Sequence, residues 1–433
     1  MMNGHDKTFR SFLIIWSGQL LSAIGSGLTA FALGVYVFQK TQSTTSFSLV
    51  ILCSFLPSFL LLPFSGVLAD RFDRKKMMII GDSGSIAGLL FILFFMLTGS
   101  IELWHIYIGV VMSAISASIL SPAYKAAVSD LVSEEKYAQA SGLIQLAGSA
   151  QYLISPIIAG FLLSFFDIKT VLVIDILSFL LAAAAVFIIM KQIHTPKRIE
   201  QQSFFSEMAE AFRYLLSQRG VLWLVVLMSV VCFYIGLMQS LFGPMMLTLT
   251  DSKVLGIALS IAASGMLVSS IFIGIFGTGK NRVFILSLFL TLAGLFYALM
   301  GVFTTVTLIV VFGFLFFLTL PFVNTSLEVL IRTNIDNERQ GRVWSLVSAI
   351  SQIGMVLAYG SAGFLADYLF SPLLAPDRLL GQTVGSIIGT GPGRGIGFLF
   401  VVSGVMVAIL AIVIGRVRRI KELEGKMAKE SNV

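Results

Sequence analysis

The sequence predicts an all-α membrane protein with twelve transmembrane helices in two six-helix bundles. The chain of 433 residues is 57% hydrophobic and only 12% charged, with a mean hydropathy of +0.95. Soluble domains carry about 25% charged residues. The apolar residues gather into runs that are each long enough to cross a bilayer as a helix. The basic residues fall at the ends of these runs, mostly at the ends that would lie on one side of the membrane.

Twelve apolar runs predict twelve spans, at about 10–38, 46–69, 77–98, 104–129, 137–166, 168–190, 220–249, 254–277, 282–302, 304–331, 341–366 and 396–416. A polar stretch separates the sixth run from the seventh. The predicted division is therefore an N-terminal bundle, a cytoplasmic linker, a C-terminal bundle and a cytoplasmic tail, at 1–190, 191–219, 220–419 and 420–433.

The positive charges predict the orientation of the chain. Of its 29 Lys and Arg residues, all but Lys40, Lys169, Lys253, Arg378 and Arg394 lie at helix ends on one side of the membrane. Loops rich in Lys and Arg stay in the cytoplasm, so both termini are expected there. The net charge of +7 thus follows topology and does not indicate a nucleic-acid partner. The two cysteines lie inside apolar runs and the three histidines are scattered, so neither a metal site nor a cofactor is expected.

The linker contains an amphipathic pattern. Its apolar positions recur at helical spacing: Phe204, Phe205, Met208, Phe212, Leu215 and Leu216. Polar residues lie on the opposite side, which predicts a helix in the membrane interface. A linker role is the main interpretation and partner binding the alternative.

The two halves resemble each other in sequence. Residues 134–162 align with 337–365 at an offset of 203, which places Ala159-Gly160-Phe161-Leu162 on Ala362-Gly363-Phe364-Leu365. Two parallel repeats of this kind describe transporters whose halves are related by an axis along the membrane normal.

The turn Gly66-Val-Leu-Ala-Asp70-Arg71-Phe-Asp-Arg74-Lys-Lys76 joins the second and third runs. Asp70 ends one helix, where the macrodipole disfavours an anion, and Arg74 begins the next, where it disfavours a cation. Each charge is therefore expected to have a partner elsewhere. The alternative is a simple positive-inside loop.

Polar side chains at helical spacing within the spans predict a weakly polar cavity. An amide that faced lipid would be costly. The candidates to line the cavity are Gln19, Ser22, Ser26, Gln145, Tyr152, Tyr234, Met238, Gln239, Asn324 and Gln352. Such a cavity suits a bulky, amphiphilic substrate. For the serines, close helix packing is the alternative.

Three carboxylates lie within spans, and intramembrane carboxylates are functional candidates by default. Asp82, Asp175 and Glu328 are therefore the candidates for proton coupling. The alternatives are a cross-helix pair of Asp82 with Lys125, simple hydration of Asp175, and an intrahelical pair of Glu328 with Arg332.

The turn 66–76 resembles the signature between helices 2 and 3 of the major facilitator superfamily. Further strings, among them Phe12–Ser22, Asp70–Asp82 and Gly341–Leu346, resemble its macrolide-efflux branch. The resemblance implies a monomeric secondary transporter in a bacterial cytoplasmic membrane. It would export hydrophobic or amphiphilic compounds, such as macrolide-like drugs, by proton antiport with alternating access. It also implies a latch at this turn, which contains Asp70, Arg71 and Arg74. In it Asp70 contacts the start of helix 11 at Arg342, and Arg74 is a second partner of Asp70.

Two alternatives to drug export stay open. One is export of a natural product, such as a siderophore or a lipid-like molecule. The other is a membrane-embedded enzyme, for which the sequence offers no catalytic cluster, so no enzymatic activity is expected. The antiporter pattern in helix 5 has Ser155 in place of the usual Gly, so proton antiport is implied by the resemblance alone.

Overall fold

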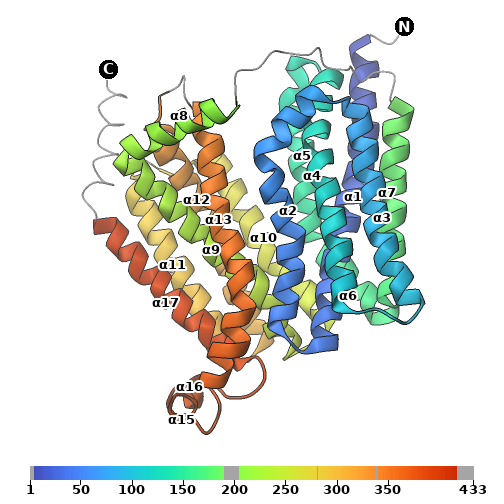
Figure 1. Ribbon diagram of the computed structural model, residues 1–433. Coiled ribbons are helices and arrows are strands. Elements are labelled where there is room, and N and C mark those ends of the chain that lie inside the picture. Colours follow the sequence, from blue (N-terminus) through green and yellow to red (C-terminus); the bar gives the residue numbers. More distant parts are fainter. Residues whose placement is uncertain (1–3, 190–203, 280, 337–339, 417–433) are drawn as a thin grey trace. The chain divides into compact units, whose positions relative to one another are not determined.

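The computed structural model describes residues 4–189, 204–279, 281–336 and 340–416, which are almost entirely helical and contain no strand (Figure 1). Within these ranges the side chains of residues 4–8, 63, 65–71, 129, 130, 134, 204–208 and 342 are not described. Twelve of the helical segments are long and apolar enough to span a membrane. This confirms the predicted all-α membrane fold.

The chain divides into two compact units. Unit 1 comprises residues 1–42, 46–200 and 252–260, and unit 2 comprises 43–45, 201–251 and 261–433. Two helices are therefore shared. The first residues of α2 belong to unit 2 and the rest of α2 to unit 1, whereas the first residues of α10 belong to unit 1 and the rest to unit 2.

The helices of unit 1 are α1 (Gly4–Thr41), α2 (Thr44–Arg71), α3 (Arg74–Leu97), α4 (Leu103–Leu131), α5 (Tyr137–Leu153), α6 (Ser155–Phe165) and α7 (Ile168–Ile189). Its core is made mostly by α1, α3, α4 and α7. Small residues allow α1 and α7 to approach closely, since a Cβ at Gly18 would lie 3.0 Å from Ala182 Cα. This approach places the polar face of α1 beside α7.

The predicted span 137–166 is interrupted at Ile154, which separates α5 from α6. Pro156 lies in the first turn of α6, where proline is tolerated because its missing N–H has no partner in the helix. The hydroxyl of Ser155 donates to the Ile24 carbonyl of α1 at 2.9 Å. The interruption is thus fixed by a side-chain bond to the neighbouring helix.

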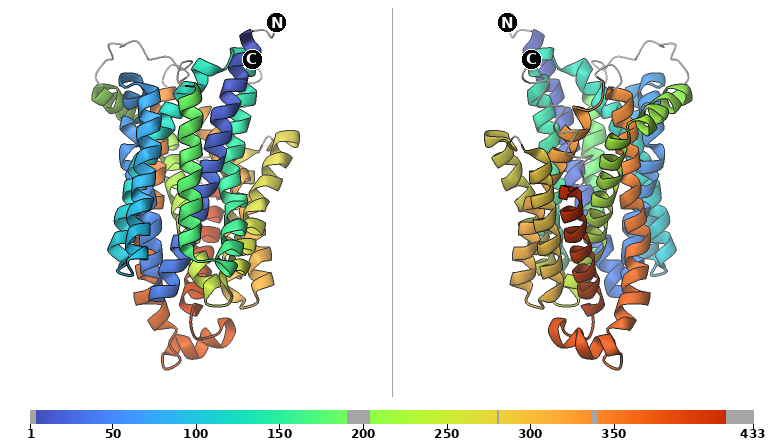
Figure 2. Two further views of the ribbon diagram at one scale, coloured as in Figure 1. Left: turned by 90° about the vertical axis from the view of Figure 1, so that its right-hand side faces the viewer. Right: turned by 90° about the vertical axis from the view of Figure 1, so that its left-hand side faces the viewer.

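The helices of unit 2 are α8 (Phe204–Ser217), α9 (Arg219–Leu247), α10 (Ser252–Phe276), α11 (Arg282–Val302), α12 (Val306–Arg332), α13 (Gln340–Phe364), η3 (Leu365–Phe370), α14 (Ser371–Leu373), α15 (Leu379–Thr383), α16 (Gly385–Ile388) and α17 (Arg394–Arg416). In the right-hand view of Figure 2 α17 runs beside α11. Glycines make this contact close, because a Cβ at Gly294 would lie 2.5 Å from the Gly404 carbonyl oxygen.

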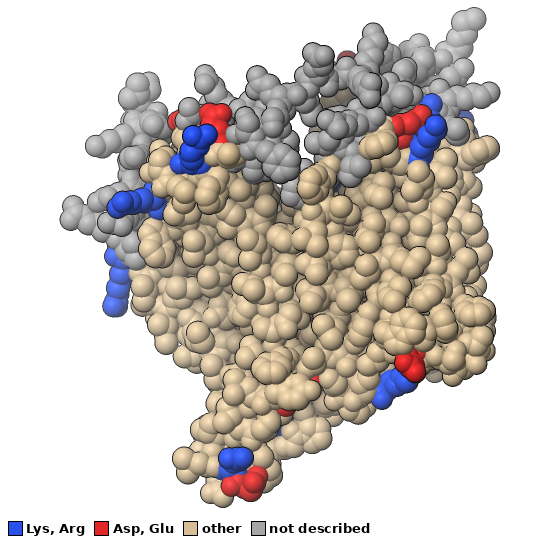
Figure 3. Space-filling model, viewed as in Figure 1, with Lys and Arg blue, Asp and Glu red and all other residues tan. Residues whose placement is uncertain are grey.

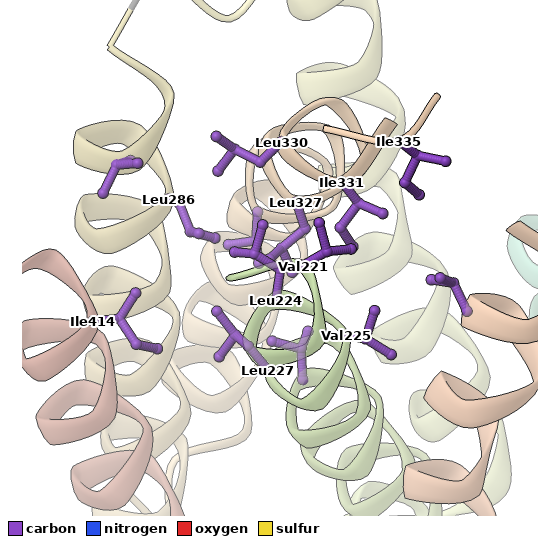
Figure 4. Close-up of a cluster of buried hydrophobic side chains, with 14 of the residues drawn as sticks. Val221, Leu224, Val225, Leu227, Leu286, Leu327, Leu330, Ile331, Ile335 and Ile414 are labelled. Atoms are coloured by element: carbon purple, nitrogen blue, oxygen red, sulfur yellow. The ribbon is translucent and has the colours of Figure 1, made fainter. Parts of the chain in front are cut away.

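Branched aliphatic side chains fill one end of unit 2 (Figure 4). Leu224 of α9, Leu327 of α12 and Leu286 of α11 are each fully buried there. The predicted amphipathic helix is α8, and Leu215 on its apolar side joins the same cluster, whereas Phe212 and Leu216 are 46% and 48% exposed. The linker helix is thereby tied to the core of unit 2.

The stretch 367–395, between the last two predicted spans, contains more helix than the sequence indicated. The helix that begins with α13 continues through the π-helix η3 and α14, so its membrane-spanning segment reaches Leu373. The remainder contains α15 and α16, with Gly389, Gly391 and Gly393 in left-handed conformations that favour glycine.

Charged side chains gather near the helix ends on the face shown in Figure 3, while the helix middles carry almost none. This distribution is that of helices whose central turns lie in lipid.

Candidate functional site

The polar face of α1 is partly buried in unit 1. Gln19 is half-buried, and its Nε2 has no hydrogen-bond partner among the described residues. Ser22 is buried and Ser26 half-buried, one and two turns further along. Trp16 joins α1 to α5, because its indole N–H donates to the Leu143 carbonyl of α5 at 2.7 Å. The two helices that carry candidate amides in unit 1 are therefore adjacent.

The face of α5 is open. Gln145 is exposed and Tyr152 is 66% exposed in the isolated chain. Between them Gly148 has no atom within 4 Å of the position that its Cβ would take. An open helix face with an amide and a phenol in mid-span is suited to contact a ligand with both apolar and polar parts.

In unit 2, the amide of Gln239 is linked to a residue that the sequence analysis did not select. The Tyr359 hydroxyl donates to Gln239 Oε1 at 2.5 Å and joins α13 to α9. Gln352 Nε2 donates to the Ser348 carbonyl of its own helix at 3.3 Å. Tyr234 and Asn324 are half-buried, whereas Met238 is 1% exposed and packs inside the bundle.

A shallow groove of about 280 Å³ lies between α9 and α13. Its lining is almost wholly apolar: Val226, Ser229, Val230, Phe233, Ile350, Ile353, Gly354 and Leu357. The helices cross closely at this point, since a Cβ at Gly354 would lie 2.9 Å from the backbone nitrogen of Phe233. The groove offers apolar contact and few hydrogen bonds.

Asp82 of α3 is completely buried in unit 1. Neither of its carboxylate oxygens has a hydrogen-bond partner among the described residues. Lys125, the cross-helix partner considered from the sequence, is exposed and does not pair with it. An ionised carboxylate would be costly in this position.

Asp175 of α7 is also buried, at 1% exposed, but it has a partner. The Ser178 hydroxyl donates to the Asp175 backbone carbonyl at 2.7 Å and lies 3.2 Å from its Oδ1. Gly25 of α1 makes room for this pair, because a Cβ there would lie 2.6 Å from Asp175 Oδ1. The carboxyl group therefore faces α1 and its polar residues, not open solvent.

Glu328 of α12 forms the intrahelical ion pair that the sequence offered as an alternative. Its Oε1 lies 2.7 Å from Arg332 Nη2, and both side chains are about half exposed. The ion pair with Arg332 gives Glu328 a structural role.

The side chains of Asp70, Arg71 and Arg342, proposed to form a latch, lie outside the described part of the structure. Arg74 Nη1 donates to the Ala126 carbonyl of α4 at 3.2 Å. Asp73 caps α3, since its Oδ1 accepts from the Lys75 backbone N–H at 3.0 Å.

Two further charged residues stand out that sequence reasoning did not select as sites. Arg394 is 4% exposed at the start of α17 and donates to the carbonyls of Gly301, Val302 and Phe303 at the end of α11. Asp367 of η3 accepts hydrogen bonds from residues 43–45 at the start of α2. In the sequence, Asp367 is an isolated acidic residue four positions after Gly363, and both repeats have a glycine at that place.

Comparisons with known proteins extend the resemblance over nearly the full chain. The model of the Major Facilitator Superfamily matches residues 15–358. Macrolide efflux protein A of Streptococcus pyogenes is 28% identical over 98% of this chain and 100% of that protein. Enterobactin exporter EntS of Salmonella typhimurium is 27% identical over 49% of this chain and 50% of that protein.

Solved transporter structures share the fold. A bacterial homologue of the human lysosomal transporter Spinster aligns with a TM-score of 0.70 at 14% identity, over 98% of this chain and 99% of that one. The peptide transporter PepTSo aligns with a TM-score of 0.71 at 10% identity, over 94% and 98%. At such low identity these likenesses describe the fold alone.

Proposed function

We propose an export function for this chain, which belongs to the major facilitator superfamily. Its substrates would be hydrophobic or amphiphilic compounds of the macrolide kind. The observation that carries this proposal is the similarity to macrolide efflux protein A, which runs from end to end of both chains. The chain is a multi-pass membrane transporter of small molecules.

The chemistry of the candidate residues supports such a substrate. The spans offer amides, phenols and apolar surface. Of the three carboxylates predicted within them, Asp82 and Asp175 are buried and Glu328 is paired with an arginine. A macrolide is bulky and mostly apolar with scattered hydroxyl groups. Its binding requires large contact area and a few hydrogen bonds, which Gln145 and Tyr152 of α5 can provide.

Export would be coupled to inward proton flow. Of the three predicted carboxylates, Asp82 and Asp175 are the stronger candidates to carry the proton, because both are buried and neither forms an ion pair among the described residues. Glu328 is the weaker candidate, since it is paired with Arg332. The protein would work as a monomer in a bacterial cytoplasmic membrane with both termini in the cytoplasm.

The test is transport into inverted membrane vesicles that contain the protein. A radiolabelled macrolide should accumulate when a proton gradient is imposed, acid inside, and the accumulation should collapse with an uncoupler. Vesicles with an Asp82→Asn, Asp175→Asn double variant are the matched control. Macrolide accumulation equal in both vesicle types would refute coupling through these groups, and absence of any accumulation would refute macrolide export.

A second candidate substrate is a siderophore. The enterobactin exporter matches about half of the chain, which gives this alternative a specific basis. The same vesicles, supplied with enterobactin in place of the macrolide, distinguish the two.

A further inference from the structure

The start of α2 is held by a carboxylate from the far end of the chain. Asp367 Oδ1 accepts from the backbone N–H of Thr44 at 3.2 Å, and its Oδ2 accepts from that of Thr45 at 2.9 Å. The hydroxyls of Ser43 and Thr45 donate to the same Oδ2, each at 2.9 Å. Asp367 thus does for α2 what an N-cap side chain does for its own helix.

Electrostatics favour this contact. The first N–H groups of a helix have no partner within it, and the helix dipole makes its N-terminus attractive to an anion. Hydrogen bonds to an ionised acceptor are also stronger than those between neutral groups. Four such bonds converge on the one carboxylate of Asp367.

The backbone around Asp367 is shaped for this approach. Gly363 lies four residues earlier, and a Cβ there would lie 2.6 Å from the Thr45 nitrogen and 2.7 Å from the Thr44 carbonyl oxygen. Only glycine lets α2 start so close. Between the two residues the chain enters the π-helix Leu365–Phe370, a rare conformation that frequently marks functional sites.

The other repeat makes the matching contact without a charge. Gly160, the counterpart of Gly363, seats the start of α10, since a Cβ there would lie 2.6 Å from the Ser252 carbonyl oxygen. The residue that matches Asp367 at the same offset is Ser164, and its hydroxyl donates to the Phe161 carbonyl of its own helix at 2.7 Å. Of these two equivalent glycine contacts, the one at Gly363 is accompanied by a carboxylate that binds the start of the neighbouring helix, whereas the one at Gly160 is accompanied by a serine.

We propose that Asp367 is a positioning residue for the transport cycle and that its carboxylate is a releasable clasp on the N-terminus of α2. Residues 43–45 belong to unit 2, whereas α2 continues from Ser46 in unit 1. Alternating access moves one half of such a transporter against the other. Because α2 passes from one unit to the other at Ser46, that movement acts on the contact with Asp367, and the clasp thereby biases the equilibrium between the two access states.

The proposal goes beyond macrolide export and does not depend on it, because its test needs neither a drug nor a proton gradient. Spin labels are attached to Thr98→Cys in unit 1 and Gln382→Cys in unit 2, both at exposed positions, after replacement of Cys53 and Cys232. Pulsed electron resonance of the purified full chain in lipid nanodiscs then gives the distance distribution.

Asp367→Ala is expected to raise the ratio of long to short distances between the two spin labels by about 5- to 30-fold. This is the effect of losing a good helix cap. Thr45→Val removes one of the four donors and should give a smaller shift in the same direction. Asp367→Asn keeps the side chain's size and one acceptor, so it carries the test if the alanine variant does not fold. Asp377→Asn removes an exposed carboxylate of the same segment and is the matched control.

The proposal is overturned if the Asp367 variants keep the wild-type distance distribution. It is equally overturned if Asp377→Asn shifts the distribution as far as the Asp367 variants do, because the effect would then be one of net charge and not of the clasp.

Discussion

Glu328 and Arg332 form an ion pair with an O–N distance of 2.7 Å on one face of α12, and the Arg332 guanidinium packs 4.6 Å from the centre of the Trp344 ring of α13. The carboxylate therefore orients an arginine that links two helices of unit 2. This relationship separates Glu328 from Asp82 and Asp175, which have no ion-pair partner among the described residues.

Glu328→Gln should leave gradient-driven export close to that of the wild type. The pair is about half exposed, so its loss should lower the free energy of unfolding by no more than about 1 kcal/mol. Export into inverted vesicles and thermal unfolding in detergent measure the two quantities. Export that no longer responds to the proton gradient would return Glu328 to a coupling role.

Asp82→Asn should abolish the response of export to the proton gradient while the protein stays folded. A buried carboxyl group without a partner contributes little to stability, so the melting temperature should be unchanged or raised. Ser85→Ala changes another fully buried polar residue, three positions along α3, and serves as the control. Wild-type gradient dependence in Asp82→Asn would exclude this residue from coupling.

Asp175→Asn should likewise reduce gradient-driven export, because the amide retains the shape but cannot exchange a proton. Ser178→Ala removes the hydroxyl that donates to Asp175 and should have a smaller effect, since the carboxyl group itself remains. Export measured at several imposed gradients distinguishes the two variants. Equal losses in both would indicate that packing against α1, and not proton exchange, is what Asp175 supplies.

Gly363→Ala should destabilise the start of α2, whereas Gly360→Ala should not. The alanine methyl group at 363 would meet the Thr45 backbone, but at 360 no atom lies within 4 Å. Alanine also favours a helix over glycine by about 1 kcal/mol, so Gly360→Ala should raise the melting temperature. Thermal unfolding of both variants tests the contrast. A Gly363→Ala protein as stable as Gly360→Ala would mean that the contact is loose.

Gln145→Cys should react with a water-borne thiol reagent and Met238→Cys should not. The first position is exposed on α5 and the second is 1% exposed inside unit 2, although the sequence placed both beside the cavity. The assay uses a background without Cys53 and Cys232 and records the labelled fraction with time. An inert Gln145→Cys would indicate that its face of α5 contacts lipid and not water.

The helices could be predicted from the sequence, because the length of an apolar run and the basic residues at its ends are local properties. It was less informative about prolines. Pro122, Pro244 and Pro321 lie within continuous helices, whereas Pro156 follows a break at Ile154. At the break, Ser155 has a hydrogen-bond acceptor on α1. Such an acceptor is a matter of tertiary structure, so the sequence offers no sign of which proline interrupts a helix.

The candidate site shows the same limit. The Glu328–Arg332 pair could be predicted because the two residues are one turn apart. The bond of Tyr359 to Gln239 spans 120 positions, and that of Asp367 to Thr45 spans 322. The predicted span ends at 366, so the sequence places Asp367 just outside it, whereas in the structure Asp367 belongs to the π-helix and contacts the start of α2.

Arg394 has a consequence for synthesis of the chain. Its guanidinium binds three carbonyls at the end of α11 that lie 91, 92 and 93 positions earlier, and a cation there complements the helix dipole. A ribosome adds roughly 5–20 residues per second, so α11 spends about 5–20 s in the nascent chain before its capping residue exists. During that interval the three carbonyls at the end of α11 lack the cation that caps them, and a translation pause between α11 and α17 would prolong this state.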